Sequence, residues 1–223
     1  MPAPSGETSS ELRSRARAIL RRLSKVCPDA RCALDFTTPL ELLVATILSA
    51  QCTDERVNMV TPALFAKYRS ARDYASATQA EMEADIHSIG MFRRKAWALR
   101  EACAQIHDTY GGEVPSTMEE LLALPGVARK TANVVLGNAF GIPTGVVVDT
   151  HVFRLAHRMG FTDQVYREKV EAELMDLWPK SQWVNAAHVF ILHGRQVCVA
   201  RKPLCTVCAV ADLCPKLSAP KPK

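Results

Sequence analysis

The chain has 223 residues, of which 48% are hydrophobic, 23% charged and 6% aromatic. This composition supplies enough apolar surface for a core, which excludes a mainly disordered protein, and the length suits one or two domains. No segment approaches the ~20 consecutive apolar residues that span a bilayer, and residues 1–10 lack the apolar core of a secretory signal. The formal charge of +5 permits a polyanionic partner such as nucleic acid without requiring one. We therefore expect a soluble intracellular protein with no membrane partner.

Helix-start signals and apolar residues at helical spacing recur along the chain. Thr38–Glu41 and Thr78–Glu81 are capping boxes, and Ser116–Glu119 predicts a third. Further helices are expected at about 91–110, from about 130, and near 149–159, 165–177 and 184–194. Only residues 146–148 resemble a strand, and one strand of this length cannot form a sheet. The sequence predicts an all-α fold.

The segment 124–136, Leu-Pro-Gly-Val-Ala-Arg-Lys-Thr-Ala-Asn-Val-Val-Leu, joins two predicted helices through a tight turn. This pattern indicates a helix-hairpin-helix, in which the turn around Gly126 and Ala128 presents backbone N–H groups of the second helix to a phosphate. Such a contact holds the DNA backbone and carries no sequence information. An ordinary corner between two packed helices would have the same turn, so the turn alone leaves both interpretations open.

Lys130 falls in the first turn of the helix after the hairpin, and Asp149 follows the apolar residues 146–148. A lysine nucleophile must be neutral, whereas an ordinary lysine with a pKa of ~10.4 is almost entirely charged at neutral pH. A helix N-terminus, the adjacent Arg129 and partial burial would each lower the pKa of Lys130, while Asp149 could accept a proton or stabilise a developing cation. The alternatives are a solvated Lys130 and an Asp149 that caps the next helix. Asp149 could serve both purposes.

Four of the eight cysteines lie within 17 residues: Cys198, Cys205, Cys208 and Cys214. A disulfide framework is typical of small secreted chains, so we expect these cysteines to bind a metal. Four thiolates can surround either a tetrahedral zinc ion or an iron–sulfur cluster, and their spacing of six, two and five intervening residues leaves both open. Arg201 and Lys202, between the first two cysteines, predict a short loop that contacts phosphate.

Together, the hairpin, Lys130, the segment 146–154 and the cysteine spacing resemble the endonuclease III family. Members of this family are DNA glycosylases with apurinic/apyrimidinic (AP) lyase activity in base excision repair. The similarity extends from about Leu40 to Cys214 and so covers most of the chain.

The resemblance implies two helical domains that flank a DNA-binding cleft. Residues 32–143 would form a six-helix barrel that carries the hairpin. Residues 1–31 and 144–223 would form a second, discontinuous domain that holds a 4Fe–4S cluster in the loop 198–214, with the four cysteines as ligands.

The resemblance also implies a reaction. Lys130 would attack C1′ of the damaged nucleotide, expel the base and form a Schiff base, and β-elimination would then cut the strand 3′ to the lesion. Asp149 would assist deprotonation and stabilise positive charge on the sugar. The partner would be double-stranded DNA with an oxidised or ring-saturated pyrimidine, such as thymine glycol, or an abasic site. We expect a monomer that acts on nucleoid DNA in the cytoplasm.

Two further residues match the family's wedge positions, where a side chain fills the space left by a flipped nucleotide: Gln51 and Met91. The alternative is that Gln51 caps a helix end and Met91 packs beneath its loop. The sequence departs from the family's usual pattern at Met91, where leucine is more common, and at Ala128, which replaces the second glycine of the hairpin. His151, just after Asp149, would support the cleft.

Two other classes of protein share part of this pattern. The related adenine-mismatch glycosylases have the cluster but lack the lysine nucleophile, so Lys130 argues against them, as does the end of the chain nine residues after Cys214. A DNA-binding iron–sulfur module that senses redox state would keep the hairpin and the cysteines. Such a module would not need Lys130 paired with Asp149.

Overall fold

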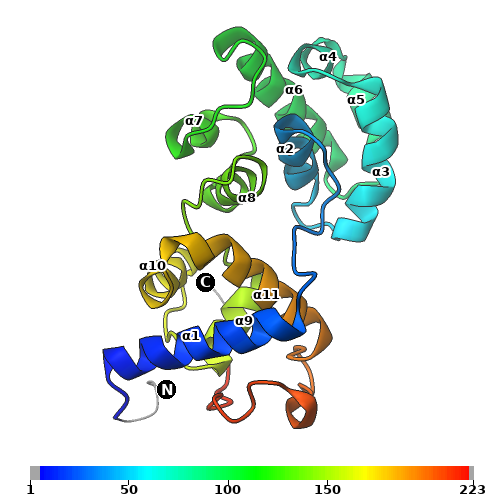
Figure 1. Ribbon diagram of the computed structural model, residues 1–223. Helices are drawn as coiled ribbons and strands as arrows, with labels where there is room; N and C mark the ends of the chain where they lie inside the picture. The colour runs from blue at the N-terminus through cyan, green and yellow to red at the C-terminus, as the bar shows by residue number, and fades with distance from the viewer. Residues whose placement is uncertain (1–5, 221–223) are drawn as a thin grey trace. The chain divides into compact units, whose positions relative to one another are not determined.

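The computed structural model describes residues 6–220, and within this range it contains helices and no strands, which confirms the predicted all-α fold (Figure 1). The chain divides into two compact units. We call Cys32–Ile142 the hairpin unit, and Met1–Arg31 with Pro143–Lys223 the cysteine unit. Residues 1–5 and 221–223 of the second unit lie outside the described range. Every described helix is too short or too polar to cross a bilayer.

The hairpin unit contains seven α-helices, of which three have only 6 or 7 residues. In chain order they are α2 (Pro39–Leu48), α3 (Asp54–Lys67), α4 (Ala71–Ser76), α5 (Gln79–Asp85), α6 (Phe92–Thr109), α7 (Met118–Ala123) and α8 (Arg129–Ala139).

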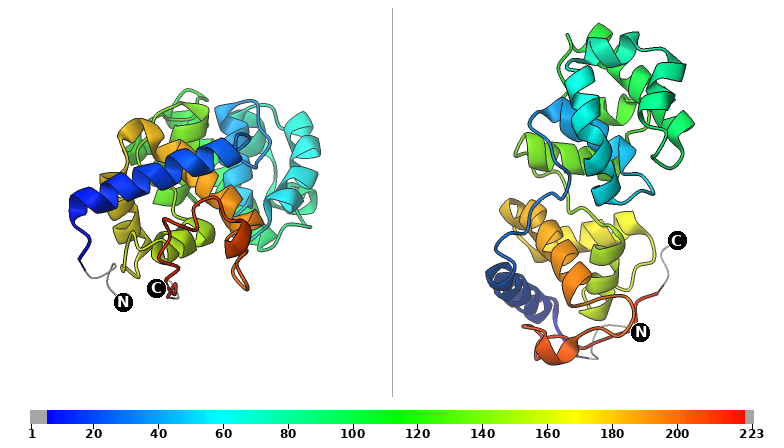
Figure 2. Two further views of the ribbon diagram at one scale, coloured as in Figure 1. Left: turned by 60° about the horizontal axis from the view of Figure 1, so that its bottom comes forward. Right: turned by 90° about the vertical axis from the view of Figure 1, so that its right-hand side faces the viewer.

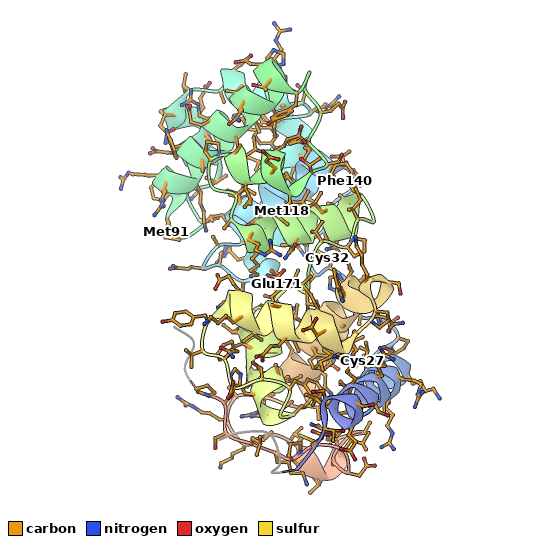
Figure 3. All side chains as sticks on the ribbon, turned by 90° about the vertical axis from the view of Figure 1, so that its left-hand side faces the viewer. Cys27, Cys32, Met91, Met118, Phe140 and Glu171 are labelled. Carbon is orange, nitrogen blue, oxygen red and sulfur yellow. The ribbon has the colours of Figure 1, made fainter. Side chains whose placement is uncertain are left out.

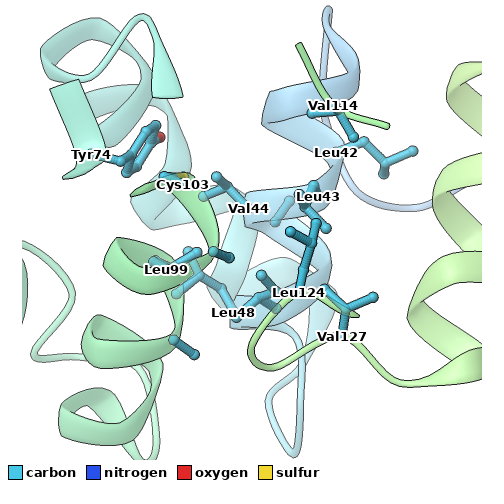
Figure 4. Packing of buried hydrophobic residues seen from close by; sticks show 14 of the residues in the cluster. Leu42, Leu43, Val44, Leu48, Tyr74, Leu99, Cys103, Val114, Leu124 and Val127 are labelled. Carbon is cyan, nitrogen blue, oxygen red and sulfur yellow. The ribbon is translucent and has the colours of Figure 1, made fainter. Parts of the chain in front are cut away.

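The core of the hairpin unit is built around α2. All residues from Leu42 to Leu48 are buried, because α2 contacts α3, α6 and α8. A helix that is apolar on every side can be stable only in such a central position. Figure 4 shows the packing, in which the side chains of Leu43 and Leu48 meet Leu124 and Leu99 from the surrounding elements.

Side-chain caps start most helices of this unit. Five of them begin after a serine or threonine whose hydroxyl accepts a hydrogen bond from the first turn, and only α6 and α8 do not. The capping boxes predicted at Thr38 and Thr78 are both present. The third prediction, at Ser116, is wrong: the N-cap of α7 is Thr117, one residue later, whose hydroxyl accepts the N–H of Glu120 at 3.3 Å. Val114 and Pro115 are buried just before it, which fixes where the extended chain ends.

The cysteine unit contains four α-helices and two short 3-10 helices within the described range. They are α1 (Ser9–Val26), α9 (Thr150–Arg158), α10 (Arg167–Leu177), η1 (Lys180–Gln182), α11 (Trp183–Gln196) and η2 (Cys205–Val207). Helix α1, which Figure 2 shows from two sides, packs against α10 and α11.

Aromatic side chains fill the core of the cysteine unit. Trp178 meets Phe161 edge-on at 5.9 Å between ring centroids and Phe190 at 5.3 Å. The indole N–H of Trp178 donates to the carbonyl of Ala16 at 3.2 Å and so ties α1 to the rest of the unit. Residues 146–148, which resemble a strand in sequence, have no regular secondary structure, and they lead into α9 with Val146 and Val148 buried.

Candidate functional site

The turn between α7 and α8 has the compact form of a helix-hairpin-helix. Val127 donates its N–H to the carbonyl of Leu124 at 3.1 Å, and both side chains are buried. Gly126 has a φ of +80°, and a Cβ built on it would lie 2.9 Å from the Cβ of Ala98 on α6. Both facts require glycine, because another residue would be strained in this conformation and would collide with its neighbour. The turn is therefore held rigidly against α6.

The start of α8 has no capping side chain. Its N-cap is Ala128, which is exposed and has a φ of −100° and a ψ of 169°. This is ordinary extended backbone, so the alanine found in place of the usual glycine fits without strain. A helix N-terminus of this kind presents backbone N–H groups and positive dipole charge, which together favour an anion.

Lys130 is the second residue of α8 and lies in the first turn, as predicted. Its side chain is exposed, as in the alternative interpretation of a solvated lysine, and the partial burial that would favour its neutral form is not found. It is therefore a solvent-accessible amine at the start of a helix, next to Arg129.

Gln51 and Met91 occupy two turns that touch each other in the hairpin unit. Both have left-handed backbone conformations, with φ of +51° and +57°. A Cβ built on Gly90 would lie 3.9 Å from the carbonyl oxygen of Gln51, so the two turns are in contact. Non-glycine residues in this conformation are uncommon and are concentrated at functional sites.

Neither turn matches the alternative offered for it. Met91 is 45% exposed and lies at the outside of its unit, so it does not pack beneath the loop (Figure 3). Gln51 is also exposed, and the residue that caps the end of α2 is Ser49. Both side chains are free to meet a ligand.

Asp149 is the N-cap of α9, as one of its two sequence interpretations predicted. Its Oδ1 accepts the backbone N–H groups of His151 and Val152, both at 2.8 Å. No hydrogen bond to Oδ2 is found within residues 6–220, so the carboxylate is held by one oxygen and keeps the other available. The cap therefore fixes the orientation of the group without consuming it.

The sequence reasoning missed two arginines of α9 that contact the cysteine segment. Arg154 donates to the carbonyl of Gly194 at 2.8 Å and to that of Cys198 at 3.1 Å and 3.0 Å. A Cβ on Gly194 would lie 2.9 Å from the Cβ of His151, so glycine is required for α11 to approach α9 this closely. Burial lowers the pKa of His151, which favours the neutral ring, and its Nδ1 lies 3.2 Å from Arg154.

Arg158 makes the second set of contacts. It donates to the carbonyls of Val199 and Ala200 at 2.7 Å and 2.8 Å, and its guanidinium also lies 3.3 Å from the Sγ of Cys198. The four-residue spacing of Arg154 and Arg158 places both on one face of α9, and this spacing is the signal that could have identified them.

The four predicted cysteine ligands line a single cavity of about 70 Å³. None of them is in a disulfide. Among residues 6–220, no three His, Cys, Asp or Glu side chains are placed to hold a single metal ion, so a larger group such as a cluster is the one to compare with this cavity. Burial raises the pKa of Cys208 and Cys214, so these sulfurs require a cationic partner to be thiolates. His193 is buried beside them, with Nε2 3.5 Å from the Sγ of Cys208. Four thiolates around one cavity fit an iron–sulfur cluster, which is held by four cysteines.

The loop between the first two cysteines exposes Arg201 and Lys202. Its ends are joined by a hydrogen bond of 3.0 Å from the N–H of Leu204 to the carbonyl of Val197. Lys202 has a φ of +54°, which makes it the third non-glycine residue in the left-handed region among the candidate DNA-binding residues, after Gln51 and Met91. Arg158 holds the base of this loop, so the two exposed cations project from a fixed support.

The candidate residues thus fall into two groups, one in each unit. The hairpin unit brings together the contacting turns of Gln51 and Met91, and it also carries Gly126, Ala128 and Lys130 on the α7–α8 hairpin and the start of α8. The cysteine unit links Asp149, at the start of α9, to the cysteine cavity through the two arginines of that helix.

Two family descriptions match the chain. Residues 44–180 match the HhH-GPD superfamily of base excision DNA repair proteins, and residues 198–214 match the iron–sulfur binding domain of endonuclease III. The second match falls on the segment that begins and ends with the first and last of the four cysteines.

Similar proteins agree with these matches. The chain is 56% identical over 207 residues to endonuclease III of Synechocystis, covering 93% of this chain and 94% of that protein. It is 41% identical over 196 residues to endonuclease III of Escherichia coli, covering 88% and 92%. A solved structure of a trapped endonuclease III–DNA covalent intermediate matches with a TM-score of 0.86 and 46% identity, over 92% of this chain and 96% of that one. The resemblance found in the sequence is confirmed.

Proposed function

The chain belongs to the endonuclease III family of base excision DNA repair proteins, and from this premise we propose how its own residues carry out the reaction. It is a bifunctional DNA glycosylase and AP lyase, and its cofactor is a 4Fe–4S cluster. The observation that carries the proposal is the place of Lys130, exposed in the first turn of an uncapped helix directly after the hairpin.

In the proposed reaction, the Nζ of Lys130 attacks C1′ of the damaged nucleotide. The bond from C1′ to the base breaks, and the base leaves with the electron pair of that bond. The sugar ring then opens at the C1′–O4′ bond as the nitrogen forms a double bond to C1′, and O4′ becomes a hydroxyl by taking up the proton that the amine gave up, which leaves a Schiff base. Abstraction of a proton from C2′ then expels the 3′ phosphate by β-elimination. Asp149 accepts a proton from the attacking amine and stabilises positive charge on the sugar through its uncommitted Oδ2.

DNA binding divides among three features. The backbone around Gly126 and Ala128 holds a phosphate at the start of α8, and Arg201 and Lys202 contact the backbone electrostatically. The side chains of Gln51 and Met91 fill the space left by the extruded nucleotide, which offsets part of the few kcal/mol lost on unstacking. The substrates are oxidised or ring-saturated pyrimidines and abasic sites in duplex DNA.

Cys198, Cys205, Cys208 and Cys214 would hold the cluster. When bound, the cluster would supply a covalent cross-link among these four cysteines and so clamp the loop that exposes Arg201 and Lys202. Arg158 supports the same loop from α9. We further propose that the enzyme acts as a monomer on nucleoid DNA in the cytoplasm.

Borohydride reduction tests the assignment of the reaction. With a duplex that contains an abasic site, we expect efficient covalent trapping of the protein, and with a panel of lesion duplexes we expect release of oxidised pyrimidines. An adenine-mismatch glycosylase would release adenine and give no efficient adduct. A redox-sensing module would bind the duplex and release no base, and either result would contradict the proposal.

A further inference from the structure

Lys95 is the only lysine buried within residues 6–220, with 4% of its surface exposed. It lies on α6, and its Nζ donates one hydrogen bond, of 2.8 Å, to the carbonyl of Leu48 at the end of α2. No carboxylate of the described residues lies within 4.0 Å of it. Burial lowers its pKa, although the nearby Cys52 thiol acts in the opposite direction.

A buried ammonium with a single acceptor is unfavourable for folding. Lysine has three N–H donors, and a buried charge without a paired carboxylate costs free energy that an apolar side chain of similar volume would not. The packing of α2 against α6 therefore does not require lysine at this position. Its hydrogen bond must serve another purpose.

The contacts of Lys95 join the two turns that carry Gln51 and Met91. Its side chain holds the carbonyl of Leu48, three residues before Gln51. Its backbone N–H donates to the carbonyl of Met91 at 3.1 Å. The two turns also touch directly at Gly90. One residue thus connects the end of α2 to the start of α6.

Both turns need such support. A left-handed backbone is unfavourable for a non-glycine residue, and it persists only where its surroundings hold it. Met91 starts α6 without a side-chain cap. We propose that Lys95 is a positioning residue for base excision: its side chain fixes the Gln51 turn against the start of α6, so that Gln51 and Met91 enter the duplex as one rigid unit. This inference rests on the role proposed above for Gln51 and Met91.

Replacement of Lys95 by methionine tests the inference, because methionine has similar volume and no charge. We expect Lys95→Met to melt at the temperature of the wild type or above it. Single-turnover release of a damaged base should slow by ~10- to 100-fold, since a displacement of about 1 Å can have such an effect. Trapping on a duplex with a preformed abasic site should change by less than about twofold, because a sugar without a base has no stacking or pairing to lose when it leaves the helix. Amide exchange in residues 49–53 and 90–92 should accelerate.

Arg100 provides a matched control on the same helix. Its Nε donates to the carbonyl of Ala77 at 2.6 Å, so it also ties α6 to another segment, but away from the two turns. We expect Arg100→Met to lower the melting temperature and to leave the ratio of base release to abasic trapping unchanged. If Lys95→Met does not fold, Lys95→Gln is compared with Arg100→Met by the same measurements.

Two results would overturn the inference. One is wild-type base release by a folded Lys95 variant. The other is a parallel loss of base release, abasic trapping and stability, which would make Lys95 a structural contact like Arg100. The double variant Gln51→Ala with Met91→Ala separates this failure from a failure of the proposed function. If the double variant releases bases normally, the wedge role itself is wrong; if it is slow and Lys95→Met is not, only the inference about Lys95 fails.

Discussion

The two residues assigned to the chemistry stand at the starts of two consecutive helices that begin in opposite ways. At α8 the N-cap is an alanine, no side chain caps the helix, and Lys130 follows in the first turn. At α9 the N-cap is Asp149 itself, and one of its oxygens accepts two backbone N–H groups at 2.8 Å. Both helix ends carry the same positive dipole charge.

The difference shows two uses of one physical feature. At α8 the N–H groups have no capping side chain, so an external phosphate can take that place. At α9 the same groups are used internally to orient a carboxylate whose second oxygen has no hydrogen bond within the described residues. In the proposed function, a helix start would bind substrate in the first case and position a catalytic group in the second.

The largest expected effect follows from removing the proposed nucleophile at the start of α8. Lys130→Ala should abolish borohydride trapping, with a loss of at least ~10³-fold. Alanine is a good helix former and Lys130 is exposed, so α8 should remain folded and lesion-duplex binding should be largely kept. Trapping and electrophoretic binding assays on the same preparation measure both. Undiminished trapping would show that another amine is the nucleophile.

The second effect separates the two roles of Asp149. Asparagine caps a helix about as well as aspartate, so Asp149→Asn should keep the melting temperature close to that of the wild type. Base excision should fall by about 100-fold or more, because the variant cannot accept a proton or carry negative charge. Single-turnover excision and thermal denaturation measure the two roles. If turnover stayed near that of the wild type, Asp149 would be a cap and nothing else.

Features that are local in sequence were the ones that could be predicted. The hairpin, the cysteine segment and two capping boxes each depend on residues a few positions apart, so their spacing alone identifies them. Even there, the choice between Ser116 and Thr117 as N-cap was wrong, because both are followed by glutamate three residues later. Which of the two becomes the N-cap depends on the buried residues upstream.

Contacts between distant segments could not be predicted in this way. The bond from Lys95 to Leu48 spans 47 residues, and the bonds from Arg154 to Cys198 span 44. The sequence also left open whether Lys130 is partly buried or solvated, because burial depends on how the elements pack, and spacing along the chain does not determine that packing. These residues support the candidate site, and their roles follow only from the folded structure.

A third effect concerns the other end of α9, where Arg158 holds the cysteine loop. Cys198→Ser should lose the cluster, which absorbance and iron content (~4 irons per wild-type chain) would reveal. Without its anchor, the loop should no longer present Arg201 and Lys202 together, so the slope of log affinity against log salt should flatten by about 2. An unchanged slope in the cluster-free variant would show that these two cations do not contact phosphate.

The smallest effect tests the contrast between the two helix starts most directly, because an aspartate at the N-cap of α8 would make its start resemble that of α9. Ala128 has the extended backbone of a normal N-cap, so Ala128→Asp should cap α8 and stabilise the protein by roughly 0.5–1 kcal/mol. The new carboxylate would occupy the N–H groups and repel phosphate, so DNA affinity should fall several-fold while stability rises. Ala128→Ser, which caps without charge, separates these two causes, and Ala128→Gly should alter stability and affinity only slightly. If Ala128→Asp bound DNA as tightly as the wild type, the open start of α8 would not be a phosphate site, and the contrast between the two helices would have no functional meaning.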